Sequence, residues 1–164
     1  DEWLNHRLER QMIYFQKHEV DFLCALRNNE KIGFPYAIKN DIAQITLKKL
    51  LMKVVGQTST SIFKKKVIEN TGFFDENQKY SEDANFWMRI SLKNNMAIIN
   101  EKLVITDNDY GQFGLSYNFK EMEEGVQKNI DEMFKLKKIS MAEYFFFKGF
   151  SKLKYILRIL KSKK

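Results

Sequence analysis

Two adjacent carboxylates, Glu82 and Asp83, are the residues of this sequence best suited to chemistry. They follow Ser81 and open a segment, residues 83–94, whose apolar residues recur at helical spacing. The positive end of a helix favours an ionised carboxylate, and such a group within hydrogen-bond reach of a hydroxyl can act as a general base. Acidic residues are also common at helix N-termini for purely structural reasons. The residues alone therefore leave two roles open, catalytic base and helix cap.

Five further residues could contact a ligand, and each has a structural alternative. Arg89 could bind phosphate, but an Arg inside an amphipathic helix more often forms an internal salt bridge or faces water, and we favour that role. Trp87 could line a binding site or pack in the core, and neither role is preferred. Gln57, Thr58 and Ser59 could meet a ligand at the end of a short strand, or could simply be exposed polar residues.

The elements that must position these residues follow from apolar spacing and from turn residues. Gly72 is expected to end a short helix, and Gly56 interrupts the pattern before the polar strand. We expect helices over residues 2–17, 42–55, 64–70, 83–94, 119–138 and 141–161; strands over 20–26, 58–63, 97–100 and 103–106; and loops over 28–40 and 107–117. Helices and strands alternate in this order, which predicts an α/β domain with helical additions at its C-terminus.

Composition excludes several classes of protein. The 164 residues are 44% hydrophobic and 30% charged, which is typical of one folded domain. A single cysteine, Cys24, permits neither an internal disulfide nor a thiolate metal site. No window approaches the ~20 apolar residues of a membrane span. The first residue is Asp1 rather than Met and no signal peptide follows it, so we expect the chain to be part of a longer protein.

The net charge of +7 comes from one end of the chain. Every charged residue from Lys148 to Lys164 is basic, and the rest of the chain is close to neutral. This argues against a nucleic-acid groove across the whole body. Apolar and basic residues interleave over residues 144–164, as in helices that lie on an anionic membrane surface. The equal alternative is a helix that packs its apolar side on the domain while its lysines face water.

The stretch from Gly56 to Thr106 resembles the inverting glycosyltransferases of family 2, which have the GT-A fold. In that family a Thr/Ser-rich strand precedes a Gly-x-Phe-Asp-Glu turn, and an acidic pair then opens a helix with an aromatic residue and an Arg. The corresponding runs here are Thr58-Ser59-Thr60-Ser61, Gly72-Phe73-Phe74-Asp75-Glu76, Glu82-Asp83 and Phe86-Trp87-Met88-Arg89. At the N-terminus, Asp1-Glu2-Trp3 and Leu8-Glu9-Arg10-Gln11 are similar to the family's aspartate cluster and the helix after it.

The resemblance implies a partial GT-A-like domain, a small mixed sheet flanked by helices, over residues 1–117, and a C-terminal helical extension over residues 118–164 that ends in the basic tail. It implies transfer of a sugar from a nucleotide-sugar donor to a glycan or lipid-linked acceptor, with inversion. Asp83 would be the general base and Glu82 would orient it or contact the acceptor.

The same resemblance gives Gln57, Thr58, Ser59, Trp87 and Arg89 roles in donor or acceptor binding. A divalent metal, Mn or Mg, would be bound by an aspartate cluster to which Asp1 belongs, and Asp1 alone cannot form that site. Because the family's nucleotide-binding half precedes this region, we expect the isolated chain to be inactive.

Localisation and partners complete the expectation. We expect a cytoplasmic protein, which would lie at the inner face of the membrane if residues 144–164 contact lipid. Whether the chain forms a homo-oligomer stays open. The alternative function is a non-enzymatic basic module that binds a membrane surface or nucleic acid through its tail. Donor sugar, acceptor and linkage are not readable from the residues.

Overall fold

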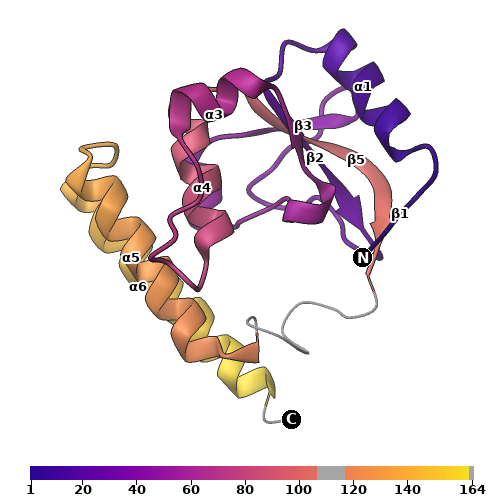
Figure 1. Ribbon diagram of the computed structural model, residues 1–164. Helices are drawn as coiled ribbons and strands as arrows, with labels where there is room; N and C mark the ends of the chain where they lie inside the picture. The colour runs from indigo at the N-terminus through magenta and orange to yellow at the C-terminus, as the bar shows by residue number, and fades with distance from the viewer. Residues whose placement is uncertain (107–116, 163–164) are drawn as a thin grey trace. The chain divides into compact units, whose positions relative to one another are not determined.

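The computed structural model describes residues 1–106 and 117–162 (Figure 1). The chain divides into two compact units. The first, Asp1–Phe73 with Phe86–Asp107, contains every strand of the sheet, and we call it the sheet unit. The second, Phe74–Asn85 with Asn108–Lys164, contains the last two helices, and we call it the helical unit. The predicted boundary between residues 117 and 118 stays a prediction, and most of the predicted 107–117 loop lies outside the described residues.

The sheet unit is built on a five-stranded mixed sheet. Strand β5 (Met96–Ile105) is central, and β2 (Phe22–Arg27) runs parallel along one side of it. On the other side, β3 (Ile42–Ile45) and β1 (Glu2–Trp3) pair antiparallel with the first and last parts of β5. Strand β4 (Ile62–Phe63) pairs antiparallel with β2. The predicted fold class, α/β with a small mixed sheet flanked by helices, is confirmed.

Helices cover the two faces of β2, because successive residues of a strand point to opposite sides. Tyr14 of α1 (Arg7–Lys17) packs in a buried cluster with Leu23 on one face. Phe22 faces the other way, and its ring lies 4.6 Å from the ring of Trp87 on α4 (Glu82–Ser91). All six residues of β2 are buried, which explains the apolar run from Phe22 to Leu26.

Several predicted boundaries are wrong, for identifiable reasons. The predicted 42–55 helix is strand β3 followed by α2 (Leu47–Met52), because Ile42 to Ile45 pair with β5. The predicted strands 97–100 and 103–106 are the single strand β5, which changes antiparallel partner along its length from β3 to β1. The predicted 2–17 helix begins only at Arg7, because Glu2 and Trp3 join the sheet.

The predicted 58–63 strand is wrong over its first half. Residues Thr58–Thr60 form a 3-10 turn, and only the short β4 after it is a strand. The helix before Gly72 is α3 (Lys65–Thr71), and Gly72 caps it with a φ of 80°.

The helical unit pairs α5 (Phe119–Lys135) with α6 (Met141–Ser162), close to the predicted ranges. The two helices run antiparallel, since Lys148 contacts Asp131 while Ser151 contacts Glu123 (Figure 1). None of the helices in the described ranges is long and apolar enough to cross a membrane.

Candidate functional site

The Ser81–Asp83 turn begins helix α4 and places two carboxylates in its first turn. Ser81 has a φ of 54°, and the helix starts at the next residue. A carboxylate oxygen of Asp83 accepts a hydrogen bond from the Ala84 N–H at 2.6 Å. The carboxylates predicted from the sequence therefore do stand at a helix N-terminus, where both cap and base roles are compatible with the backbone.

Burial gives these carboxylates unusual proton affinity. It raises the pKa of Asp83 above its ordinary value, and the backbone N–H groups of Ala84 and Asp83 only partly oppose it. The pKa of Glu82 is also raised, first by burial and then by the charge of Asp83. Within the described residues Asp83 forms no ion pair. A partly buried carboxylate that no cation compensates is a stronger proton acceptor than a fully exposed Asp.

Buried amides hold the turn in place. Asn129 of α5 donates to the Ser81 carbonyl at 3.0 Å. Gln78 donates to the Asn129 side-chain oxygen at 2.8 Å and to the Ser81 carbonyl at 3.2 Å. Asn85, one turn into α4, donates to Asn129 at 3.2 Å and to Glu132 at 2.6 Å. Because all three amides are almost inaccessible, this network fixes the backbone on both sides of Asp83.

Gly125 allows α5 to approach the turn closely. A Cβ built on Gly125 would lie 2.3 Å from the Tyr80 carbonyl oxygen and 3.2 Å from the Ser81 Cβ. The helix backbone therefore touches the chain just before the carboxylates, and any larger side chain would displace it.

Trp87 and Arg89 are engaged within the sheet unit. Trp87 is 1% exposed, and its Nε1 donates to the Gly56 carbonyl at 2.9 Å. Arg89 donates to the Thr71 carbonyl at 3.0 Å and to the Phe73 carbonyl at 2.7 Å, so it satisfies the C-terminal end of α3. Trp87 therefore packs in the core, which is one of its two predicted roles. Arg89 bonds backbone carbonyls, a structural role other than the internal salt bridge or the solvent-facing position set out above. The binding roles of Trp87 and Arg89 stay predictions.

Gln57, Thr58 and Ser59 lie around one 3-10 turn. The Gln57 carbonyl accepts from the hydroxyls of Thr60 and Ser61, both at 2.8 Å. Thr58 is exposed, and the buried Ser59 hydroxyl finds no hydrogen-bond partner among the described residues. Their proposed ligand contacts stay predictions.

Asp1 does not have the surroundings of a metal ligand. It is exposed, and the described residues contain no group of three His, Cys, Asp or Glu side chains that could hold a metal ion. The described residues therefore do not fit the Mn or Mg site that the resemblance implies, and no chemistry is assigned to a metal.

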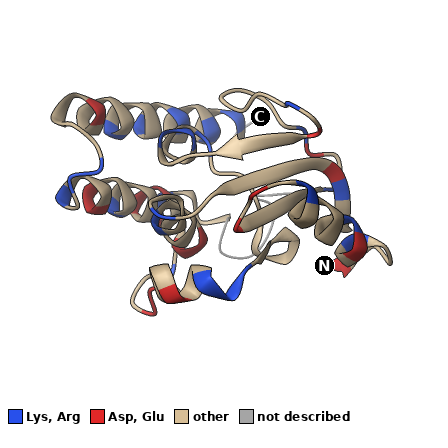
Figure 2. Ribbon diagram, turned by 90° about the horizontal axis from the view of Figure 1, so that it is seen from above, with Lys and Arg blue, Asp and Glu red and all other residues tan. Residues whose placement is uncertain are grey.

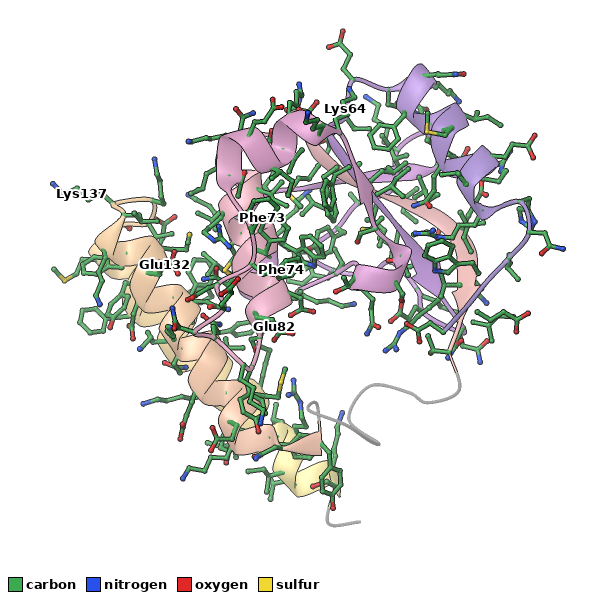
Figure 3. All side chains as sticks on the ribbon, viewed as in Figure 1. Lys64, Phe73, Phe74, Glu82, Glu132 and Lys137 are labelled. Carbon is green, nitrogen blue, oxygen red and sulfur yellow. The ribbon has the colours of Figure 1, made fainter. Side chains whose placement is uncertain are left out.

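Each unit holds part of the predicted site. Glu82 and Asp83 belong to the helical unit, while Asp1, the 57–59 turn, Trp87 and Arg89 belong to the sheet unit. Figure 3 labels Glu82 on α4 and Glu132 on α5. The Glu132 carboxylate accepts the hydrogen bond from Asn85.

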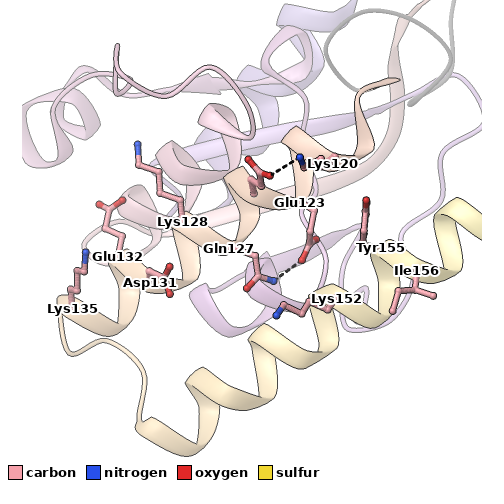
Figure 4. A pocket seen from close by; sticks show the side chains of 11 residues that line it. Lys120, Glu123, Gln127, Lys128, Asp131, Glu132, Lys135, Lys152, Tyr155 and Ile156 are labelled. Atoms are coloured by element: carbon pink, nitrogen blue, oxygen red, sulfur yellow. Dashed lines mark hydrogen bonds and ion pairs between the residues drawn. The ribbon is translucent and has the colours of Figure 1, made fainter.

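A groove of about 790 Å³ runs between α5 and α6 (Figure 4). Its charged walls carry both signs, and several charges are neutralised locally: Asp131 is 2.7 Å from Lys148, and Lys120 is 3.9 Å from Glu124. Asp83 and Glu82 are not among the residues that line it. Mixed, locally paired charges give the groove no preference for one class of ligand.

The fold has relatives among solved structures. S. aureus TarS residues 1–349, a glycosyltransferase, superposes with a TM-score of 0.54 and 14% identity, over 92% of this chain and 43% of that one. A second S. aureus TarS structure has a TM-score of 0.47 and 16% identity, over 76% of this chain and 22% of that one. The fold is glycosyltransferase-like. No protein-family model matches the chain, and no curated protein matches it in sequence.

This glycosyltransferase-like fold covers less than half of the TarS chain it matches. At such low identity the likeness concerns the path of the backbone, and residue roles must be argued from the site itself.

The amides that position Asp83 were not identified from the sequence. Asn129 lies far along the chain from Gln78 and Asn85, and the three amides show no diagnostic spacing. The one available signal was Gly125, a glycine in the interior of a long helix, which often marks a close backbone approach.

Proposed function

We propose that the chain is part of an inverting glycosyltransferase of the family 2 type, with Asp83 as general base. The observation that carries this proposal is the Asp83 carboxylate itself. It is partly buried and outside any described ion pair, its pKa is raised, and buried amides hold the adjoining turn. The glycosyltransferase-like fold makes sugar transfer the reaction class that best accounts for such a base.

In this mechanism the acceptor hydroxyl attacks the anomeric carbon of a nucleotide sugar. Its proton passes to a carboxylate oxygen of Asp83 as the new carbon–oxygen bond forms. The bond from the anomeric carbon to the diphosphate breaks, its electron pair stays on the diphosphate, and the configuration inverts. Glu82 orients the base or contacts the acceptor. Gln57, Thr58, Ser59, Trp87 and Arg89 are the proposed donor or acceptor contacts.

The partners of this reaction are a nucleotide-sugar donor and a glycan or lipid-linked acceptor, as in polysaccharide biosynthesis. A lipid-linked acceptor would place the reaction at the inner face of a membrane, with residues 144–164 near it. Dependence on Mn²⁺ or Mg²⁺ is expected for this reaction class, although Asp1 does not form such a site with the described residues.

The test compares Asp83→Asn with Glu69→Gln in the complete gene product, assayed with a panel of nucleotide sugars and glycan acceptors. Glu69 is an exposed carboxylate on α3 outside the proposed site. Transfer should fall by about 10²–10⁴-fold in Asp83→Asn and be unchanged in Glu69→Gln. Full activity of Asp83→Asn would remove the basis of the proposal.

A second test uses the chain as it stands. Titration with UDP-sugars and Mn²⁺ should give no tight binding, because the resemblance places nucleotide recognition in a preceding half. Tight and specific binding would show that this partition is wrong.

A non-enzymatic binding module is the second candidate, and the exposed apolar side of α6 favours it. Deletion of residues 144–164 separates the two functions. If the chain is part of an enzyme, the deletion leaves the site around Asp83 in place. If the chain is a binding module, the deletion removes its functional surface. Binding of nucleic acid that weakens steeply with salt and survives the deletion would favour a binding module that uses residues outside 144–164.

A further inference from the structure

Helix α6 turns its polar side chains toward α5. Lys148 is 2.7 Å and the Tyr144 hydroxyl 2.8 Å from a carboxylate oxygen of Asp131. Ser151 donates to Glu123 at 2.8 Å. Farther along, the Arg158 guanidinium lies over the Phe119 ring. Phe147 and Ser151 are the buried residues of the helix. The contact between the helices thus engages two of the five basic residues of α6, Lys148 and Arg158.

The opposite side of α6 is apolar and exposed. Positions 142, 146, 149, 153, 157 and 160 recur at intervals of three and four, so they form one stripe along the helix. Exposed large side chains on and beside this stripe are Phe145, Phe146, Leu153, Leu157 and Leu160, each between 49% and 65% accessible. A contiguous exposed row of this kind is typical of a surface that meets an apolar partner.

Lysines border the stripe on both sides. At 100° per residue, Lys152 lies at one edge of the apolar arc and Lys161 at the other, and both are exposed. Beyond Glu143 the chain carries no acidic residue, and Figure 2 shows the basic residues along the helix. Lysines in this position can extend their ammonium groups to a polar boundary while their stems cover apolar surface.

The charges around the apolar stripe distinguish the partners that could bind the outer face of α6. Two copies of α6 packed stripe to stripe would bring Lys152 and Lys161 of each helix together, and no acidic residue of α6 beyond Glu143 would compensate them. A nucleic acid would require a continuous basic surface, but Lys148 and Arg158 are directed to α5, and the apolar stripe separates Lys152 from Lys161. An anionic bilayer surface offers both an apolar layer and negative head groups.

We propose that the outer face of α6 binds an anionic lipid surface. The helix lies parallel to the surface with Phe146, Leu153 and Leu157 in the boundary between head groups and acyl chains. Lys152 and Lys161 extend to the lipid phosphates. Contact of this kind needs no membrane-spanning segment. The inference does not depend on glycosyl transfer and would hold for a non-enzymatic chain.

The experiment is co-sedimentation of the chain with vesicles of phosphatidylcholine alone or mixed with phosphatidylglycerol. The chain should bind the mixed vesicles, and added salt should weaken binding. The double variant Leu153→Asp/Leu157→Asp should lower the partition coefficient at least about tenfold. The matched control is Met12→Asp/Ile13→Asp, which adds the same charge at exposed apolar residues of α1 and should bind nearly as well as the parent chain.

Three outcomes would overturn the proposal. The first is absence of binding to the mixed vesicles, and the second is equal binding by the α6 double variant. The third is concentration-dependent self-association, measured by sedimentation velocity, that the α6 double variant abolishes, which would assign the face to a second copy. All altered side chains are exposed, and circular dichroism checks that each variant keeps its helices.

Discussion

The two units of the molecule distribute apolar residues in opposite ways. Strand β2 of the sheet unit is buried along its whole length, and its apolar side chains meet helices on both faces. Helix α6 of the helical unit is longer and buries only Phe147 and Ser151, while its leucines and isoleucines largely face outward. The sheet unit is therefore stabilised by its own core, whereas α6 leaves an apolar stripe exposed, which is the basis for the lipid contact proposed above.

Buried polar groups differ between the units as well. In the sheet unit, Asp21 is held by Lys66 at 2.7 Å and by the Asn95 N–H at 3.1 Å, so its charge is compensated. In the helical unit, the buried polar groups are mainly neutral amides that hold the Ser81 carbonyl next to the carboxylates, and Asp83 forms no ion pair within the described residues. We infer from this difference that the ion pair of Asp21 stabilises the fold, whereas the buried amides hold the Asp83 carboxylate in position.

The loss of activity in Asp83→Asn is the largest expected effect. The stability of the same variant gives a second test of the role of Asp83. Burial raises the pKa of Asp83 in the folded state, so the folded protein binds the proton more tightly than the unfolded chain. The charged form is therefore destabilising, increasingly so as pH rises above the ordinary Asp pKa of about 3.9. Asp83→Asn should unfold at higher denaturant concentration than the parent at pH 7, with the difference vanishing in acid. A less stable variant at pH 7 would assign Asp83 a structural role.

Gly56 tests the core of the sheet unit. It has a φ of 80°, and an added Cβ would lie 2.5 Å from the buried Cys24 Sγ. Gly56→Ala should lower the free energy of unfolding by about 3 kcal/mol, because backbone strain and overpacking combine. Gly33→Ala is the control, since nothing lies within 4 Å of its Cβ position. Urea denaturation measures both, and equal stability of the two variants would contradict this account of the core.

Two glycines compare the inner and outer surfaces of the helical unit. Gly125→Ala should destabilise by about 1–3 kcal/mol, because its Cβ would strike the Tyr80 carbonyl. Gly149→Ala has open space on the outer stripe of α6 and should instead stabilise by up to about 1 kcal/mol through helix propensity. Thermal unfolding distinguishes the signs. A neutral Gly125→Ala would mean that α5 does not need its close approach to the turn.

Glu101 in the sheet unit should respond to pH in the opposite sense to Asp83. Its carboxylate pairs with Arg10 and accepts from the Tyr14 hydroxyl at 2.9 Å, and the Arg10 hydrogen bond is the main cause that lowers its pKa. A lowered folded-state pKa contributes stability above the ordinary Glu pKa of about 4.3, and that stability is lost as pH falls through the folded value.

Because the Arg10–Glu101 pair is partly exposed, Glu101→Gln should cost only about 1 kcal/mol at pH 7. The difference from the parent should shrink below pH 4, as measured by denaturant titration at several pH values. Glu9→Gln, which alters an exposed carboxylate of α1, is the control. A cost that is independent of pH would show that the charge of Glu101 is not what stabilises the pair.

Sequence patterns predict well wherever a local rule decides the structure. The unbroken apolar run of β2, the glycine cap after α3 and the spacing of α5 and α6 all produced nearly correct elements. The same rules failed at Ile42–Ile45, where pairing with a distant strand overrides a pattern that also suits a helix. The carboxylates at the start of α4 were found, but Asn129 was not, because a buried amide is selected by three-dimensional neighbours that sequence spacing does not encode.

Cys24 is the sole cysteine of the sequence, and it lies fully buried in the sheet unit, where burial raises the pKa of its thiol. A maleimide therefore has no accessible thiolate to alkylate in the folded protein. A cysteine introduced at Leu160 would become a unique labelling position without removal of the native residue. An environment-sensitive fluorophore attached there would register, by its emission colour, whether the tip of α6 rests in water or in an oily layer.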